Sequence, residues 1–144
     1  MNVQSITSFK KEYTFLSNFY PVNVEFDGDC YPSVEHAYQS AKFPRQKRQK
    51  FFDKNMKPGE AKRAGKIETT KAFDDKKIEL MASLIKEKFK NESLRKKLLD
   101  TGEAFIIEGN WWNDRFWGVC DGVGENHLGI ILMNERKRIR DEDT

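Results

Sequence analysis

Three polar side chains that could do chemistry recur at the spacing of one helix face: Glu35, Gln39 and Lys42. Positions i, i+4 and i+7 share one stripe of an α-helix, so a carboxylate, an amide and an amine would point the same way. A carboxylate can act as a general base or stabilise a developing positive charge, and an amine can donate a proton or form a Schiff base. The alternative is a solvated helix face held by weak ion pairs.

The element that must carry this stripe is a helix that begins after Ser33, which is suited to an N-cap. Its apolar residues form a separate packing stripe roughly 120° away: Val34, Ala37, Tyr38 and Ala41. A rise of 1.5 Å per residue separates Glu35 from Lys42 by ~10 Å along the axis, so the two would grip different parts of one ligand. A helix N-terminus also favours an anionic ligand.

A glycine-rich loop over residues 109–126 holds a second constellation of rings, a carboxylate and an amide. Its ring at Trp117 could stack on a base, and its glycines let backbone approach phosphate. Asn126 lies at the start of a helix that could receive an anion. The loop is not a dinucleotide fingerprint, because His127 stands where a third glycine belongs. The alternative is a glycine-rich turn over core tryptophans.

A shorter segment, residues 16–20, places Ser17 and Asn18 beside the rings of Phe19 and Tyr20. Their side chains can hydrogen-bond a ligand. Ser and Asn also favour turns, so an ordinary turn is the alternative.

The composition is that of one domain spanning residues 1–144, because 16.9 kDa leaves little room for two independent cores. No apolar run approaches the ~20 residues of a membrane span, so the expected compartment is the cytosol. The cysteines (Cys30, Cys120) and histidines (His36, His127) form no zinc spacing, and neither a metal nor a disulfide is expected.

The charge is unevenly distributed along the chain. Residues 42–97 hold 19 Lys or Arg against 8 Asp or Glu, whereas the remainder holds 7 against 15. Most of these cations should cover outer helix faces. The excess would also attract phosphate groups of a nucleotide or of DNA or RNA, although no helix-turn-helix, zinc-finger or RNA-recognition signature accompanies it.

The predicted elements form a helix-rich α+β domain with a small β-hairpin or sheet. The alternation of residues 22–31 around Asp27-Gly28 predicts the hairpin. A long helix should begin at Asp74, and the last helix should end in a charged tail over residues 135–141. A short Lys/Arg-rich helix is expected around Phe51 and Phe52, and another from Pro58 to near Gly65. A further short helix should carry Leu94 and Leu98 and be closed by Gly102, and residues 104–107 predict a buried strand. The apolar face of the long helix comprises Ile78, Met81, Ala82, Ile85 and Phe89, with Phe89 and Phe105 as core rings.

Three segments together resemble the NADAR family, also called YbiA-like: residues 16–20, 31–43 and 116–129. They read LSNFY, YPSVEHAYQSAKF and FWGVCDGVGENHLG, and they stand in the family's order over about residues 15–136. The family's intermediate helix is also resembled by four residues: Pro58, Ala61, Arg63 and Gly65. Leu16 stands where many family members have a second aromatic ring beside Ser-Asn, and the basic residues 44–57 match no motif of the family.

This resemblance implies a YbiA-like fold and an N-glycosidase that needs no cofactor. Its implied substrates are phosphorylated early intermediates of riboflavin synthesis, or ADP-ribose attached to guanine in nucleic acid. Glu35, Lys42 and Asp114 become the candidate catalytic residues, with Glu35 stabilising an oxocarbenium ion. Lys42 or Asn18 would orient the leaving base, or Lys42 would form a Schiff base. The candidate substrate-binding residues are Ser17, Asn18, Phe19, His36, Gln39, Arg63, Gly65, Trp117, Gly118, Gly122, Gly124, Asn126 and Leu128.

Two other classes of protein stay open at this point. One is a non-catalytic module that binds ADP-ribose or a related nucleotide. The other is a nucleic-acid-binding protein that uses the basic region 42–97. The sequence also leaves open which substrate is used, whether DNA or RNA is involved, and what the oligomeric state is. It leaves open as well whether a Mg²⁺ ion binds with the substrate phosphates.

Overall fold

A tight hairpin opens the region that carries the first constellation. In the computed structural model, which describes residues 4–143, β2 (Val24–Phe26) pairs antiparallel with β3 (Asp29–Tyr31). Asp27 and Gly28 both have positive φ, 52° and 85°, which is the turn geometry that matches the twist of paired strands. The hairpin predicted from Asp27-Gly28 is confirmed.

The chain divides into two compact units, residues 18–88 (unit 2) and residues 4–17 with 89–143 (unit 1). The single domain expected from the length stays a prediction. The α+β class is confirmed, since helices dominate and the strands form three two-stranded sheets within residues 4–143.

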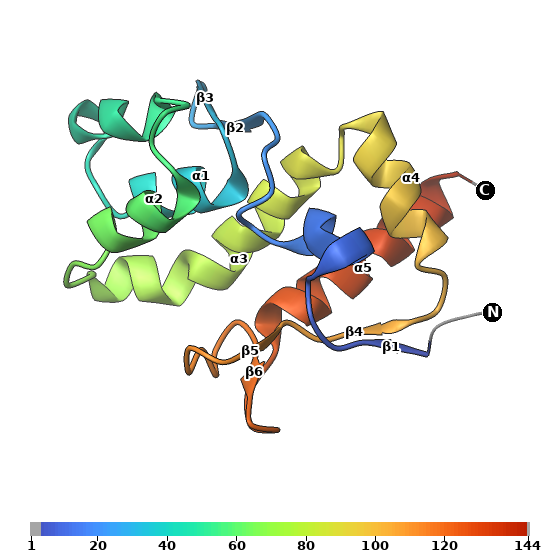
Figure 1. Cartoon of the computed structure of the whole chain (residues 1–144). Helices are drawn as coiled ribbons and strands as arrows, with labels where there is room; N and C mark the ends of the chain where they lie inside the picture. The colour runs from blue at the N-terminus through green and yellow to red at the C-terminus, as the bar shows by residue number, and fades with distance from the viewer. Residues whose placement is uncertain (1–3, 144) are drawn as a thin grey trace. The chain divides into compact units, whose positions relative to one another are not determined.

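Unit 2 is organised around the short helix α1 (Val34–Ser40), as Figure 1 shows. This helix contacts the hairpin, α2 (Pro58–Ala64), α3 (Lys71–Lys88) and the 3₁₀ helix η3 (Gln49–Phe52). A further 3₁₀ turn, η2, spans Arg45–Lys47. Because neighbours surround it, all seven residues of α1 are buried. The solvated-face alternative is therefore wrong for Glu35 and Gln39.

Helix α3 differs from its prediction at its start and in its buried face. It begins at Lys71 rather than Asp74, because Thr70 Oγ1 accepts a hydrogen bond from Phe73 N at 3.1 Å and caps the first turn. Its buried residues follow the i, i+3, i+4, i+7 spacing: Met81, Leu84, Ile85 and Lys88. Ile78 is 41% exposed and Ala82 is also exposed, so neither belongs to the core, whereas Phe89 is buried as predicted.

Lys88 is fully buried, and burial lowers the pKa of its ammonium to about 7. From about pH 7 to the ordinary value of 10.5 the unfolded chain binds a proton that the folded chain lacks, so this group makes stability rise with pH there. Lys88→Met should therefore raise the melting temperature most below pH 7, and the gain should shrink towards pH 10. Melting curves at pH 6 and 9.5 check this, with exposed Lys86→Met as control; a pH-independent gain would contradict it.

Unit 1 contains two helices and two pairs of short strands. Strand β1 (Ser5–Ile6) pairs in parallel with β4 (Phe105–Ile106), and β5 (Gly109–Asn110) with β6 (Val119–Cys120). Helix α5 (His127–Glu142) contacts both α4 (Glu92–Asp100) and β4, and η1 (Lys11–Leu16) precedes Ser17.

Two predictions about unit 1 need correction. Phe105 is 51% exposed rather than a core ring, because successive residues of a strand face opposite sides and Ile106 takes the buried side. The expected charged tail is helical, since α5 continues to Glu142. Glu135 is buried there and accepts two hydrogen bonds from the Arg138 guanidinium, at 2.9 and 2.7 Å. No helix within residues 4–143 is long and apolar enough to cross a membrane.

Candidate active site

Glu35 lies in the first turn of α1 and is only 7% exposed. Its backbone N donates a hydrogen bond to Asn18 O at 3.0 Å, so the segment before the hairpin fixes the start of the helix. Its Oε1 accepts a hydrogen bond from Gln39 Nε2 at 2.8 Å, one helical turn later. The predicted i, i+4 neighbours are thus joined directly, and the carboxylate is held in one orientation by a neutral donor.

Two buried acceptor atoms, Gln39 Oε1 and Asn18 Oδ1, have no hydrogen-bond partner among residues 4–143. Gln39 is 5% exposed, and Asn18 uses its Nδ2 in a 3.6 Å contact with Met81 Sδ. An unpaired buried acceptor costs free energy, on the order of 1–3 kcal/mol. Both atoms are therefore suited to accept hydrogen bonds from N–H or O–H groups of a ligand.

Lys42 lies two residues beyond the last residue of α1, in a turn rather than in the helix as predicted. Its Nζ donates to Gly65 O at 3.0 Å and stands 5.5 Å from the centre of the Tyr38 ring. Burial lowers the pKa of Lys42, and the charge of Glu35 opposes that decrease. A larger share of neutral amine is available than in an exposed lysine.

His36 is engaged by protein atoms at both ring nitrogens. Nδ1 lies 2.6 Å from Ser33 Oγ, and Nε2 lies 2.7 Å from Met56 O. A carbonyl oxygen only accepts, so Nε2 carries the proton and Nδ1 accepts from the Ser33 hydroxyl. The ring ties α1 to the turn before α2; its contact with substrate stays a prediction.

Three further predicted substrate-binding residues from the first half of the chain are not buried. Phe19 is 41% exposed and Arg63 is exposed on α2. Ser17 closes η1, where its backbone N donates to Thr14 O at 3.0 Å, and it belongs to unit 1.

In unit 1, Asp114 shapes the late loop. Its Oδ1 accepts hydrogen bonds from Phe116 N at 3.2 Å and from Trp117 N at 2.9 Å. Asn110 holds the same turn: its Oδ1 accepts from Asp114 N at 3.0 Å, and its Nδ2 donates to Asp114 O at 2.9 Å. The sequence analysis missed Asn110, and its only signal was the i, i+4 spacing to Asp114.

Removing this carboxylate should destabilise unit 1. We expect Asp114→Ala to lower the free energy of unfolding by about 1–2 kcal/mol, because two loop N–H groups lose their acceptor. Asp114→Asn keeps an acceptor oxygen and should lose much less. Denaturant melts of both variants measure this, with Asp121→Asn, whose side chain is 90% exposed, as the charge control. Equal losses for Asp114→Ala and Asp114→Asn would contradict the capping role.

Trp117 packs against two neighbouring rings, Phe116 and His127. Its ring lies edge-on to Phe116 at 4.8 Å and near His127 at 6.4 Å. Side chains at Gly118 or Gly124 would overlap neighbouring atoms, which explains the glycines there. The other predicted residues of this set take separate positions in the loop. Gly122 has φ +77° in an exposed turn, and Asn126 and Leu128 are buried.

The Asn126 side chain hydrogen-bonds to two backbone groups of unit 1. Its Nδ2 donates to Ile106 O at 2.9 Å, and its Oδ1 accepts from Glu108 N at 3.0 Å. It makes no side-chain cap on α5. Both polar ends of its amide are thus used by the protein backbone.

The structure gathers the predicted residues in two sets, one within each unit. In unit 2 a continuous line of contacts joins Asn18, Glu35, Gln39, Gly65 and Lys42. In unit 1, the Asp114 carboxylate accepts a hydrogen bond from Trp117 N, and Trp117 O accepts one from Leu128 N. Within residues 4–143 no group of three His, Cys, Asp or Glu could hold a metal ion.

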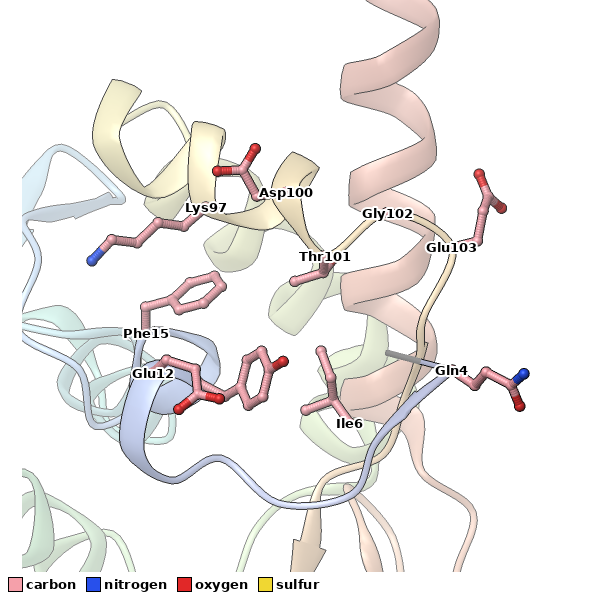
Figure 2. Close-up of a pocket in the computed structure, with 10 residues that line it drawn as sticks. Gln4, Ile6, Glu12, Phe15, Lys97, Asp100, Thr101, Gly102 and Glu103 are labelled. Atoms are coloured by element: carbon pink, nitrogen blue, oxygen red, sulfur yellow. The ribbon is translucent and has the colours of Figure 1, made fainter. Parts of the chain in front are cut away.

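A separate open cavity lies within unit 1, between η1 and the end of α4 (Figure 2). Figure 2 shows the side chains of Ile6, Phe15 and Thr101 turned towards its centre, with Lys97 and Glu12 at its margin. The residues that line it do not overlap with either predicted set. The cavity is therefore separate from the contacts that join Glu35, Gln39, Gly65 and Lys42 in unit 2.

Comparison with known proteins shows which family has this arrangement of helices and small sheets. The solved structure of Escherichia coli YbiA has the same fold, with a TM-score of 0.83 and 29% identity, covering 99% of this chain and 89% of that one. The NADAR domain matches residues 6–140. The chain belongs to the NADAR family.

Individual relatives share about a third of their aligned residues with the chain. The N-glycosidase YbiA of Escherichia coli is 31% identical over 137 residues, which cover 92% of this chain and 85% of that protein. An N-glycosidase of Nostoc punctiforme is 32% identical, with 89% and 86% covered. A riboflavin biosynthesis protein of Vibrio vulnificus is 34% identical over 91% of this chain, which spans only 37% of that protein's length.

Proposed function

We propose that the chain is an N-glycosidase that hydrolyses the bond between a ribosyl C1 and a nitrogen in a phosphorylated, nucleotide-type substrate. The observation that carries this proposal is the buried Glu35 carboxylate held by the Gln39 amide. Family membership and relatives named N-glycosidases support it.

Breaking a ribosyl C–N bond develops positive oxocarbenium charge at C1, and an oriented carboxylate stabilises that charge. Glu35 takes this role and accepts a proton from the attacking water. The water oxygen bonds to C1, the C1–N bond breaks, and the leaving nitrogen gains a proton. The net change is the addition of one water molecule across the bond.

Lys42 has two possible roles in this reaction. As an ammonium it donates a proton or hydrogen bond to the leaving base. As a neutral amine, which its lowered pKa favours, it adds to C1 of the opened ribose and forms an imine as the base leaves. Water then hydrolyses the imine and frees both the sugar and Lys42.

The substrate is one of two phosphorylated classes, ADP-ribose attached to guanine or an early intermediate of riboflavin synthesis. The relative named as a riboflavin biosynthesis protein supports the second class. Both carry N–H and O–H donors that suit the unpaired Gln39 and Asn18 oxygens. Offering both classes side by side and detecting the released products by mass spectrometry tests the proposal; an intact pool of both substrates would overturn it.

Trp117 is the ring we propose to stack on the base. Trp117→Ala should raise the apparent KM about 10-fold and lower kcat less, because one stacking contact contributes about 1–3 kcal/mol. Steady-state kinetics measure the split. Trp111→Ala is the matched control, since that ring is 81% exposed. An unchanged KM for Trp117→Ala would count against stacking.

In the first substrate class, ADP-ribose attached to guanine, the guanine can belong to a nucleic acid. Between residues 45 and 66 the chain has nine Lys or Arg and two Asp or Glu, and seven of the nine are exposed. The exposed cations are Arg45, Lys47, Lys50, Lys54, Lys57, Arg63 and Lys66. We propose that they contact phosphates. Affinity for duplex and single-stranded DNA should fall steeply with salt, and weak, salt-independent binding would argue against the contact.

A further inference from the structure

Gly65 contacts two side chains of the unit 2 set at once, Lys42 and Gln39. Its carbonyl oxygen accepts the hydrogen bond from Lys42 Nζ at 3.0 Å. Its α-carbon faces the Gln39 side chain so closely that an added Cβ would overlap Gln39 Oε1 and Cδ. The residue ends α2 with φ −86° and ψ 3°, a conformation open to any amino acid. Space, and not backbone conformation, therefore requires glycine here.

The Gln39 amide cannot move aside without changing its hydrogen bond to the Glu35 carboxylate. Its Nε2 donates to Glu35 Oε1 at 2.8 Å, which directs Gln39 Oε1 away from the carboxylate and towards Gly65. A flipped amide would set its oxygen against the carboxylate oxygen, a repulsive contact between two acceptors. Any group that fills the space at Gly65 thus acts on Glu35 through Gln39.

We propose that Gly65 is a positioning residue for the reaction, a role distinct from the direct substrate contact expected from the sequence. Its missing side chain leaves room for the Gln39 amide that orients Glu35, and its carbonyl holds the Lys42 amine. This inference rests on the proposed function. Small displacements of a catalytic group are costly, about 100-fold for 1 Å.

The test compares Gly65→Ala with Gly59→Ala, a matched change on the same helix. An added Cβ at Gly59 would lie in ordinary contact, 3.6 Å from Arg63 Nη1. With the ADP-ribosylated guanine and riboflavin-pathway substrates, Gly65→Ala should lower kcat by about 10- to 100-fold with a smaller change in KM. Gly59→Ala should keep the wild-type rate. Equal rates for the two variants would overturn the proposal.

A double-mutant cycle with Gln39→Ala separates positioning from a general structural effect. Once the Gln39 amide is gone, adding Gly65→Ala should lower kcat less than 2-fold further, because the two changes act on one contact. If Gly65→Ala also lowers the melting temperature, Gln39→Ala should restore it by vacating the space. Additive losses, or a melting temperature that Gln39→Ala leaves unrestored, would overturn the proposal.

The outcome for Glu35→Gln distinguishes this inference from the proposed function. If Glu35→Gln abolishes turnover and Gly65→Ala has no effect, only the positioning role is wrong. If Glu35→Gln turns over at the wild-type rate, the proposed function itself is wrong, and the role of Gly65 with it.

Discussion

Replacing Glu35 by glutamine should lower kcat by about 10²- to 10⁴-fold while the protein stays folded. The substitution keeps the shape of the side chain and an oxygen for the Gln39 amide, which holds it at 2.8 Å. It removes the negative charge that stabilises the oxocarbenium ion and the base that accepts a proton from water. Initial rates with both substrate classes, and circular dichroism for the fold, measure the effect.

The matched control for this variant is Glu25→Gln, the same change on the exposed edge of β2. It should turn over substrate at the wild-type rate. If the Glu35 variant binds substrate but does not cleave it, the charge is catalytic. If it cleaves at an undiminished rate, the candidate role of Glu35 is wrong, and a non-catalytic nucleotide-binding module becomes the better explanation for the buried cluster.

Replacing Lys42 by methionine should have the second-largest effect, a loss of about 10²- to 10³-fold in kcat. The apolar stem of methionine keeps the packing on Tyr38, and the amine that donates to Gly65 O is lost. Reduction with borohydride during turnover distinguishes its two roles: a covalent sugar adduct on the wild type but not on the variant indicates the Schiff base. Lys86→Met, an exposed lysine on α3 outside the proposed phosphate contacts, is the control.

The pH profile supplies a second readout for Lys42. If the neutral amine reacts, kcat should rise with pH through the lowered pKa of Lys42. Because the charge of Glu35 raises that pKa, any residual activity of Glu35→Gln should show its rise at lower pH than the wild type. If Lys42→Met has more than half of the wild-type kcat, both proposed roles of Lys42 are wrong.

The periodicity of residues 34–42 predicted the helix, its packing stripe and the shared face of Glu35 and Gln39. It could not predict that the polar stripe is buried, because burial depends on α2, α3 and the hairpin, which contact α1 from distant parts of the sequence. The same limit applies to Gly65. Its place against Gln39 joins residues 26 positions apart, and no local pattern encodes that contact.

The errors in the prediction of α3 and β4 have local physical causes. A Thr70 cap extends α3 backwards, and the buried face runs through Leu84 and Lys88 instead of Ile78. Lysine is rarely buried, so a sequence reading assigns Lys88 to the surface. In the late loop the residue types suggested ligand contacts, whereas Asp114 accepts hydrogen bonds from the loop backbone and Asn126 bonds to the backbone of Ile106 and Glu108.

The most direct test of the central claim is a side-by-side cleavage assay of the wild type and Glu35→Gln. Each protein is offered ADP-ribosylated guanine and a phosphorylated early riboflavin intermediate, and the free base and sugar phosphate are quantified by mass spectrometry. We expect the wild type to release base from at least one class and Glu35→Gln to release at most about a hundredth as much. Equal release by the two proteins, or none from the wild type, would contradict the claim that Glu35 drives N-glycosidic hydrolysis.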